Sequence, residues 1–315
     1  MSPTSKTANS IPIDQAFPGV FSPKTGINVT ASTIHGVEGS YTIDTFPEAE
    51  KKRNHYDSRE GSKIKYLIMH YTVDDFASTV KTFTSNISQG RTSSHFVITQ
   101  KEEKVTRGKL LQVVPEDMRA WHAGVSAWKQ DKNLNALSLG IEHVNTGFTE
   151  GEEHGEISYD RTYYPFDVDQ IYTSGIISKD IMKQYNILPQ YVLGHEDIAP
   201  GRKSDPAIFF PWPKLYNEHG VGAWLDNDEM NKDIIIQKYH PTRDYPTEPN
   251  QGVLLQMLIS YGYCHAETTT SSSIIKAFKA HFSANQHPEL YDDNIRQEEM
   301  FWAWALEAKY SCYNS

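Results

Sequence analysis

Histidine residues at the ends of two apolar runs are the side chains in this chain best suited to catalysis or metal binding. His70 closes the run 64–71, and His195 closes the run 191–195 and is followed by Asp205 in the next loop. If that loop folds back, two imidazoles and one carboxylate meet and leave a fourth position open for water, as a catalytic zinc site requires. Spacing alone favours a plainer interpretation, in which each histidine is a hydrogen-bonded structural residue and Asp205 opens a turn.

Buried strands must carry these histidines, because the runs that end on them are almost entirely apolar. Further strands are predicted at 95–98, 111–114 and 137–144. Apolar residues at helical spacing predict a helix that Asp74 or Asp75 can cap, and a second, long helix over 168–185. Strands and helices alternate, so the predicted fold class is α/β, with a central mixed β-sheet flanked by helices.

Composition divides the chain into four parts. Residues 1–60 are rich in Ser, Thr, Pro and Gly and predict an N-terminal extension with one short strand near 40–43. The catalytic domain is expected at 61–225, followed by a polar, proline-spaced linker at 226–249. Residues 250–315 predict a small C-terminal three-helix domain. Its helices are expected at 253–261, 273–282 and 297–310, the second capped by Ser272 or Ser273.

The overall charge excludes some classes of partner. A net charge of −10 at pH 7 and a pI of about 5.7 argue against a nucleic-acid-binding surface, while leaving room for one local basic site. No apolar run reaches membrane-spanning length, and the first residues lack the apolar stretch of a signal peptide. Cys264 and Cys312 could form a disulfide or remain two buried thiols, and the sequence supports both equally.

Five ordered sequence blocks add weight to the zinc interpretation. In chain order they are IMHYT at 68–72, SHFVI at 94–98, AWHAG at 120–124, SLGIE at 138–142 and GHEDIAPGRKSDP at 194–206. Together they resemble the type 2 N-acetylmuramoyl-L-alanine amidases, relatives of the phage lysozyme amidases and the animal peptidoglycan recognition proteins. The resemblance covers about residues 62–214. It implies zinc-dependent hydrolysis of the amide bond between N-acetylmuramic acid and the L-alanine of the peptidoglycan stem peptide.

The resemblance implies a role for each residue of the candidate site. It makes His70, His195 and Asp205 the ligands of one catalytic zinc ion (Zn2+), with Asp205 standing where many relatives have cysteine. Glu142 corresponds to the catalytic glutamate, which takes a proton from water and returns it to the leaving amine. Lys203 corresponds to the lysine that stabilises the oxyanion. A salt-bridged strand carboxylate is the structural alternative for Glu142.

Three further residues are expected at the substrate. Trp121 and His122 are expected to form the wall of the cleft. Arg202 faces solvent or binds a substrate carboxylate, and the sequence does not choose between these roles. By contrast, His95 is expected to be structural, and His143 is expected in the core because it points away from the face that carries Glu142.

A non-catalytic protein that recognises peptidoglycan or a muropeptide is the alternative function, because some proteins of this fold bind peptidoglycan without a metal. The complete ligand set together with Glu142 and Lys203 favours the enzyme. The C-terminal helices resemble the peptidoglycan-binding helical domain of some amidases, and an inert buttress is the other interpretation. A monomer in the bacterial periplasm or cell envelope is expected, with the cytoplasm as the alternative location.

Overall fold

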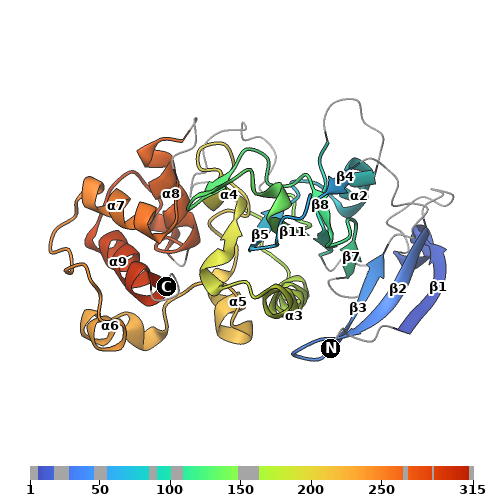
Figure 1. The fold of residues 1–315 in the computed structure, drawn as a ribbon, viewed down its shortest axis with the longest axis horizontal. Helices are drawn as coiled ribbons and strands as arrows, with labels where there is room; N and C mark the ends of the chain where they lie inside the picture. Colours follow the sequence, from blue (N-terminus) through green and yellow to red (C-terminus); the bar gives the residue numbers. More distant parts are fainter. Residues whose placement is uncertain are drawn as a thin grey trace.

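A computed structural model describes residues 6–17, 28–45, 55–84, 91–100, 109–147, 163–264, 269–285 and 287–311 of the chain. Its central element is an eight-stranded mixed β-sheet with the strand order β1-β2-β3-β7-β6-β11-β5-β12 (Figure 1). In sequence order these strands are β1 (Lys6–Pro12), β2 (Asn28–His35), β3 (Ser40–Thr45), β5 (Tyr66–Tyr71), β6 (Phe96–Ile98), β7 (Leu110–Gln112), β11 (Ser138–His143) and β12 (Val192–Gly194). Two small antiparallel pairs lie outside this sheet: β4 (Tyr56–Ser58) with β8 (Met118–Ala120), and β9 (Ala127–Trp128) with β10 (Asp131–Lys132).

The middle of the sheet is parallel. β6, β11, β5 and β12 are neighbours in that order and run in one direction, so their carboxyl ends lie at the same edge of the sheet. Edges of this kind are where open α/β sheets bind ligands. Every residue of β11 is buried, and so is nearly all of β5, which explains their continuous apolar sequences. The predicted α/β class, with a mixed central sheet flanked by helices, is confirmed.

One predicted strand ends earlier than expected. β12 stops at Gly194, and His195 begins the short helix α4 (His195–Ile198) instead of closing the strand. The carboxylate of Asp197 accepts a hydrogen bond from the backbone N–H of Gly194 at 2.7 Å, and this bond starts the helix. The direction of the His195 side chain is therefore set by the first turn of α4 and not by the pleat of β12.

Helices cover both faces of the sheet. α2 (Phe76–Thr84) is capped by Asp75, whose carboxylate accepts from the N–H of Ser78 at 2.7 Å, and α3 (Val168–Tyr185) matches the predicted long helix. Val97 of β6 packs in the same cluster as α2, whereas its neighbours Phe96 and Ile98 pack in the cluster that contains α3. Because successive strand residues point to opposite faces, α2 and α3 lie on opposite sides of the sheet.

The N-terminal extension contains more structure than the one short strand predicted near 40–43. β1, β2 and β3 form an antiparallel meander, and β3 pairs in parallel with β7, so the extension continues the central sheet. Polar Thr and Ser residues alternate with apolar ones in β2 and β3, which hides the strands from a search for apolar runs. α1 (Ile13–Ala16) follows β1 directly.

The predicted linker at 226–249 also contains regular structure. It carries a 3-10 turn, η3 (Asn227–Glu229), and the helix α6 (Lys232–Tyr239). α6 follows α5 (Trp212–His219), and Ile235 is its one fully buried apolar residue. A helix with a single buried residue has almost no apolar periodicity, so the polar composition of this stretch predicted a linker instead. The remaining 3-10 turns are η1 (Leu134–Ala136), η2 (Pro189–Tyr191) and η4 (Pro288–Leu290).

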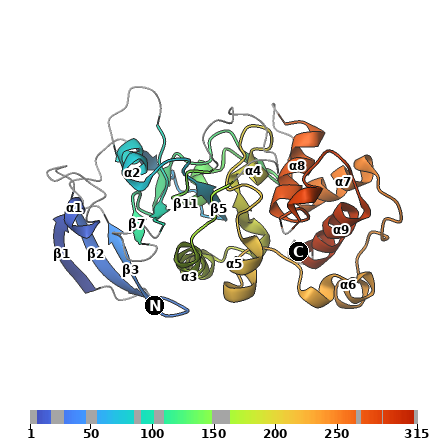
Figure 2. The same cartoon turned by 180° about the vertical axis from the view of Figure 1, so that it is seen from behind.

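The C-terminal region consists of α7 (Gln251–Tyr261), α8 (Ser271–His281) and α9 (Gln297–Ser311), as predicted. The cap of α8 is Thr270, whose hydroxyl accepts from the N–H of Ser273 at 3.1 Å, not Ser272 or Ser273. The molecule is elongated, with β1–β3 at one end and α6, α7 and α9 at the other (Figures 1 and 2). One continuous hydrophobic cluster nevertheless joins the C-terminal helices to the sheet.

The cysteines and the predicted lack of a membrane-spanning segment are the remaining predictions about the fold. Cys264 is half-buried, and its Sγ lies 2.7 Å from the carbonyl oxygen of Lys129. Cys312 lies outside the described residues, so the pairing of the two stays a prediction. Among the described residues, no helix is both long and apolar enough to cross a membrane.

Candidate active site

Two neighbouring strands place a histidine and a glutamate side by side. In the parallel pairing of β5 with β11, His70 stands directly opposite Glu142, and residues in register on adjacent strands share a face of the sheet. β12 lies on the other side of β5 with Gly194 opposite Met69, so His195 begins α4 beside His70. The pairing of three strands therefore brings these side chains to the carboxyl edge.

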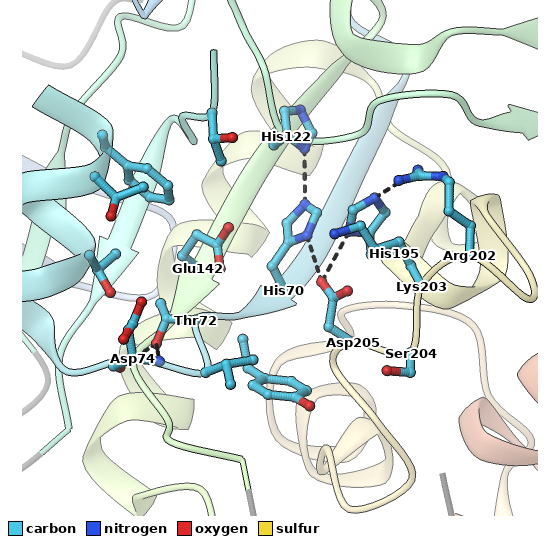
Figure 3. Close-up of a pocket in the computed structure, with 16 residues that line it drawn as sticks. His70, Thr72, Asp74, His122, Glu142, His195, Arg202, Lys203, Ser204 and Asp205 are labelled. Carbon is cyan, nitrogen blue, oxygen red and sulfur yellow. Dashed lines mark hydrogen bonds and ion pairs between the residues drawn. The ribbon is translucent and has the colours of Figure 1, made fainter. Parts of the chain in front are cut away.

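Asp205 completes a group of three candidate metal ligands. Its Oδ2 atom lies 2.8 Å from Nδ1 of His70 and 3.1 Å from Nδ1 of His195 (Figure 3). The loop from α4 folds back as expected, and the N–H of Glu196 donates to the carbonyl of Asp205 at 2.9 Å. Two N or O ligands about 2.0 Å from a tetrahedral ion lie roughly 3.3 Å apart. The two distances to Asp205 are close to that spacing, and one ligand atom from each of the three residues lies within 4.8 Å of the others, so these residues fit one small metal ion.

The protonation states of these ligands also suit a cation. Burial, followed by the charge of His195, lowers the pKa of the His70 imidazole to about 4. Burial acts to raise the pKa of Asp205, but the two histidines outweigh it and hold that pKa well below its usual range. At neutral pH His70 is therefore neutral and Asp205 is a carboxylate, which are the metal-binding forms of both groups.

Further hydrogen bonds orient the two histidines. Nε2 of His70 lies 2.9 Å from Nδ1 of His122, whose own Nε2 lies 3.0 Å from the hydroxyl of Ser138. Nδ1 of His143 lies 2.9 Å from the carbonyl oxygen of His70 and thereby ties the backbone of β5 to β11. Nε2 of His195 lies 3.1 Å from the carbonyl oxygen of Ala123. These partners fix which nitrogen of each imidazole faces Asp205.

A cavity of about 400 Å³ opens beside this group. Glu142 lines it and is 9% exposed, and its Oε2 atom has no hydrogen-bond partner among the described residues. Burial, followed by the charge of Asp205, raises the pKa of Glu142 to about 8, while Lys203 acts in the opposite direction. In the described part of the chain, no basic side chain forms a salt bridge with Glu142, so the structural alternative for this residue is not supported. A carboxyl group that titrates near neutral pH can both accept and return a proton.

Lys203 and Arg202 line the cavity from the loop after α4. Arg202 is held by the backbone, because its Nη2 donates to the carbonyl oxygens of Ala123 and Val125 at 2.8 Å each. Its Nε donates to Val125 as well, at 3.1 Å. The side chain of Lys203 is exposed at the mouth of the cavity.

Trp121 is not among the residues that line this cavity, so its expected place in the wall of the cleft stays a prediction. The guanidinium of Arg119 lies 4.4 Å from the centre of the Trp121 ring, in a cation–π contact. His122, the next residue, does line the cavity. His95 lies behind the site, with its Nε2 at 2.7 Å from Arg59 and its Nδ1 accepting from the N–H of Gly140.

The loop after β5 contributes cavity residues that the sequence did not single out. Thr72, Val73 and Asp74 line the cavity, and the hydroxyl of Thr72 donates to the carbonyl of Asp74 at 2.6 Å. Val73 has a φ of 58°, an unfavourable value for a β-branched residue, and its side chain is 47% exposed. The available signal was the block 68–72, whose last residue marks the start of this loop.

Two histidines and an aspartate beside a buried glutamate, at the carboxyl edge of a parallel sheet, define a hydrolase site that could hold one metal ion.

The family described as N-acetylmuramoyl-L-alanine amidase matches residues 60–208. The N-acetylmuramoyl-L-alanine amidase AmiD of Escherichia coli (strain K12) is 35% identical over 252 residues, covering 79% of this chain and 84% of AmiD. The 1,6-anhydro-N-acetylmuramyl-L-alanine amidase AmpD of Enterobacter cloacae is 32% identical over 109 residues, covering 35% of this chain and 50% of AmpD.

Solved structures agree with the sequence comparison. AmpDh3 from Pseudomonas aeruginosa has a TM-score of 0.64 and 33% identity, over 82% of this chain and 95% of the other. AmiD from E. coli, in complex with the substrate anhydro-N-acetylmuramic acid-L-Ala-D-gamma-Glu-L-Lys, has a TM-score of 0.62 and 33% identity, over 86% and 95%. The chain belongs to the N-acetylmuramoyl-L-alanine amidases, a family of hydrolases that act on an amide bond.

Proposed function

We propose that this chain hydrolyses the amide bond between N-acetylmuramic acid and the L-alanine of the stem peptide with one zinc ion. Nδ1 of His70, Nδ1 of His195 and Oδ2 of Asp205 would hold the ion. The observation that carries the proposal is the convergence of these three atoms beside the buried, unpaired carboxylate of Glu142. Two nitrogens and one carboxylate oxygen with a fourth position open are the ligands of a catalytic zinc site.

Zinc, when bound, supplies Lewis acidity toward the scissile carbonyl and lowers the pKa of water. The residues of the chain do the rest. Glu142 accepts a proton from the attacking water and donates it to the leaving amine of L-alanine, and its pKa of about 8 suits both transfers. The ammonium group of Lys203 at the cavity mouth stabilises the negative charge that develops on the carbonyl oxygen.

The substrate would be bound by the rim of the cavity. The bonds of Arg202 to the backbone use Nε and Nη2, so Nη1 is left to bind a carboxylate of the stem peptide. His122 lines the cavity as expected for a substrate-binding residue, but its bond to His70 gives it a second role as the partner that orients a ligand. Recognition without catalysis is the less supported alternative, because both the ligand set and the base are present.

The relatives suggest the form of the substrate and the place of the reaction. AmpD is named for the 1,6-anhydro sugar, and AmiD was crystallised with an anhydro-muropeptide, so we propose soluble anhydro-muropeptides as substrates. We place the reaction in the bacterial envelope, with the cytoplasm as the alternative, and propose a monomer. We propose an N-terminal extension at 1–60, a catalytic domain at 61–225, a linker at 226–249 and a helical peptidoglycan-binding-like domain at 250–315.

Mass spectrometry of a muropeptide digest tests the proposal. The purified protein is incubated with an anhydro-muropeptide and with its non-anhydro form, each with and without a chelator. Release of a peptide with an L-alanine N-terminus, abolished by the chelator and restored by zinc, is the expected result. Asp205→Asn should lose both the bound zinc and the release. A protein that binds zinc and leaves both muropeptides intact would refute the hydrolase and favour recognition alone.

A further inference from the structure

A buried aspartate links the helix of a candidate metal ligand to the C-terminal region. Asp197 lies two residues after His195 in α4 and is fully buried. Its Oδ1 accepts a hydrogen bond from the hydroxyl of Tyr263 at 2.6 Å, and its Oδ2 lies 2.6 Å from Nδ1 of His281. The same Oδ2 accepts from the N–H of Gly194 at 2.7 Å. A buried carboxylate needs such donors, and here two of the three come from the C-terminal region: His281 from α8 and Tyr263 from just after α7.

Both donors are themselves held in place. The ring of His281 stacks on Trp212 with the ring centres 3.9 Å apart, and the ring of Tyr263 packs edge-on against Trp128 at 4.8 Å. Tyr263 and His281 are both essentially unexposed. α8, which carries His281, lies beside α4 in both views of the molecule (Figures 1 and 2). Donors that cannot rotate fix the position of the carboxylate they bind.

The C-terminal region also supports the other side of the His195 ring. The N–H of Lys129 donates to the carbonyl oxygen of Gly262 at 2.8 Å, which ties the hairpin of β9 and β10 to the end of α7. That hairpin follows Ala123, whose carbonyl oxygen lies 3.1 Å from Nε2 of His195. The helix that carries His195 and the segment that orients its ring therefore both rest on the C-terminal helices.

We propose that Tyr263 and His281 are positioning residues for the metal site. Through Asp197 they hold α4 so that Nδ1 of His195 faces Asp205. This inference rests on the proposed zinc site. It gives the C-terminal helices a part in metal binding, beyond buttressing the fold or binding peptidoglycan. Ordinary packing between two parts of the chain would stabilise the protein without changing its affinity for zinc.

Tyr263→Phe tests the inference, because it removes one hydroxyl and keeps the ring. Tyr310→Phe is the matched control: its buried hydroxyl also joins the C-terminal helices to the rest of the chain, through the N–H and carbonyl of Trp224, but does not reach α4. Zinc affinity is measured by competition with a chelator, and apo-protein stability by thermal unfolding. Both variants should melt a few degrees lower than wild type. Only Tyr263→Phe should bind zinc more weakly, by about tenfold.

Activity gives a second readout. Tyr263→Phe should have a reduced kcat at limiting zinc, a normal KM, and full kcat when zinc is in excess. His281→Asn keeps a donor at the position of Nδ1 and His281→Leu does not, so His281→Asn should retain zinc affinity close to wild type and His281→Leu should not. Equal zinc affinity in wild type, Tyr263→Phe and Tyr310→Phe would overturn the inference and leave the proposed function standing. A wild-type protein that binds no zinc would overturn both.

Discussion

Glu142 is a buried residue of β11, and burial of its carboxyl group raises its pKa. Its neighbour across the strand pair is His70, and its Oε2 is unpaired among the described residues. A general base contributes about 10²–10⁴-fold to a rate. Glu142→Gln should therefore lower kcat by that factor while zinc binding is unchanged, as measured by peptide release and chelator competition.

A matched substitution separates the proton transfer from burial. Glu116 is another carboxyl group whose pKa is raised by burial, but it bonds to Tyr185 and Gln184 and does not line the cavity. Glu116→Gln should keep the wild-type kcat. If both variants were equally impaired, Glu142 would be a structural residue.

His122 permits a second test at the same scale. His122→Phe keeps a ring in place but removes the nitrogen that faces Nε2 of His70. The loss of a partner that orients a metal ligand costs about 10–100-fold in affinity, so zinc should bind more weakly by that factor. Trp121→Phe, one residue away and outside the cavity, should bind zinc like the wild type. An unchanged zinc affinity in His122→Phe would restrict His122 to substrate binding.

At the scale of elements, the ionic cluster around Glu229 joins η3, α6 and α9. Glu229 is fully buried, and its Oε2 accepts from Nζ of Lys309 at 2.6 Å while Tyr239 donates to Oε1. Burial acts to raise the pKa of Glu229, but the bonds from Lys309 and Tyr239 outweigh it and lower the pKa to about 2. The carboxylate therefore stabilises the fold fully above its ordinary pKa of 4.5, and this stabilisation is lost as the pH falls toward 2.

Glu229→Gln should remove this pH dependence. At pH 7 the variant should lose about 1.5–3 kcal/mol of unfolding free energy, the usual contribution of hydrogen bonds to a charged group. Its stability should then change less than that of the wild type between pH 4.5 and 2. Urea unfolding over a pH series measures both effects. Glu218→Gln, at an exposed ion pair with Lys214, is the control and should match the wild type. If the unfolding free energy of wild type and of Glu229→Gln changed with pH in the same way, the Glu229 cluster would not be the source of that pH dependence.

The elements that the sequence predicts well are those whose apolar side chains form a continuous run or repeat with the helical period. β5 and β11 are continuous runs because they are buried on both faces, and α3 has the helical period because one of its faces is buried. β2 and α6 do not: one alternates with Thr and Ser, and the other buries only Ile235. The sequence therefore predicts an extension in place of β2 and a linker in place of α6, because the stability of both elements comes from partners that are distant in the chain.

The candidate site also has features that the sequence predicts and features that it does not. The types and order of His70, Glu142 and Asp205 could be recognised from local sequence blocks. The contact between the Trp121 ring and the Arg119 guanidinium could not be predicted. The bonds of Asp197 could not be predicted either, because Tyr263 and His281 lie 66 and 84 residues further along the chain. Only the folded chain brings such pairs together.

For the molecule as a whole, the N-terminal segment packs into the hydrophobic core on one face of the sheet. Phe17 is fully buried, and its ring centre lies 4.8 Å from that of Phe76 in α2. Phe17→Ala should lower the unfolding free energy by about 3–5 kcal/mol, and unfolding should stay a single transition. Val37→Ala, at an exposed position between β2 and β3, should have no effect. A separate, early unfolding step in denaturant titrations of the wild type would show that the N-terminal strands form an independent unit.

The in-register pairing of β5 with β11 has a consequence for how such an enzyme can diversify. The spacing between Glu142 and His70, the proposed base and the proposed ligand, is fixed by the pairing of two buried strands, whereas the cavity rim is built by the loops after β5 and α4. New substrate preferences can therefore arise by exchanging rim residues such as Val73 and Asp74 without disturbing the reaction. The loop after α4 also carries Lys203 and Asp205, so the loop after β5 is the part of the rim that selection and protein engineering can alter most freely.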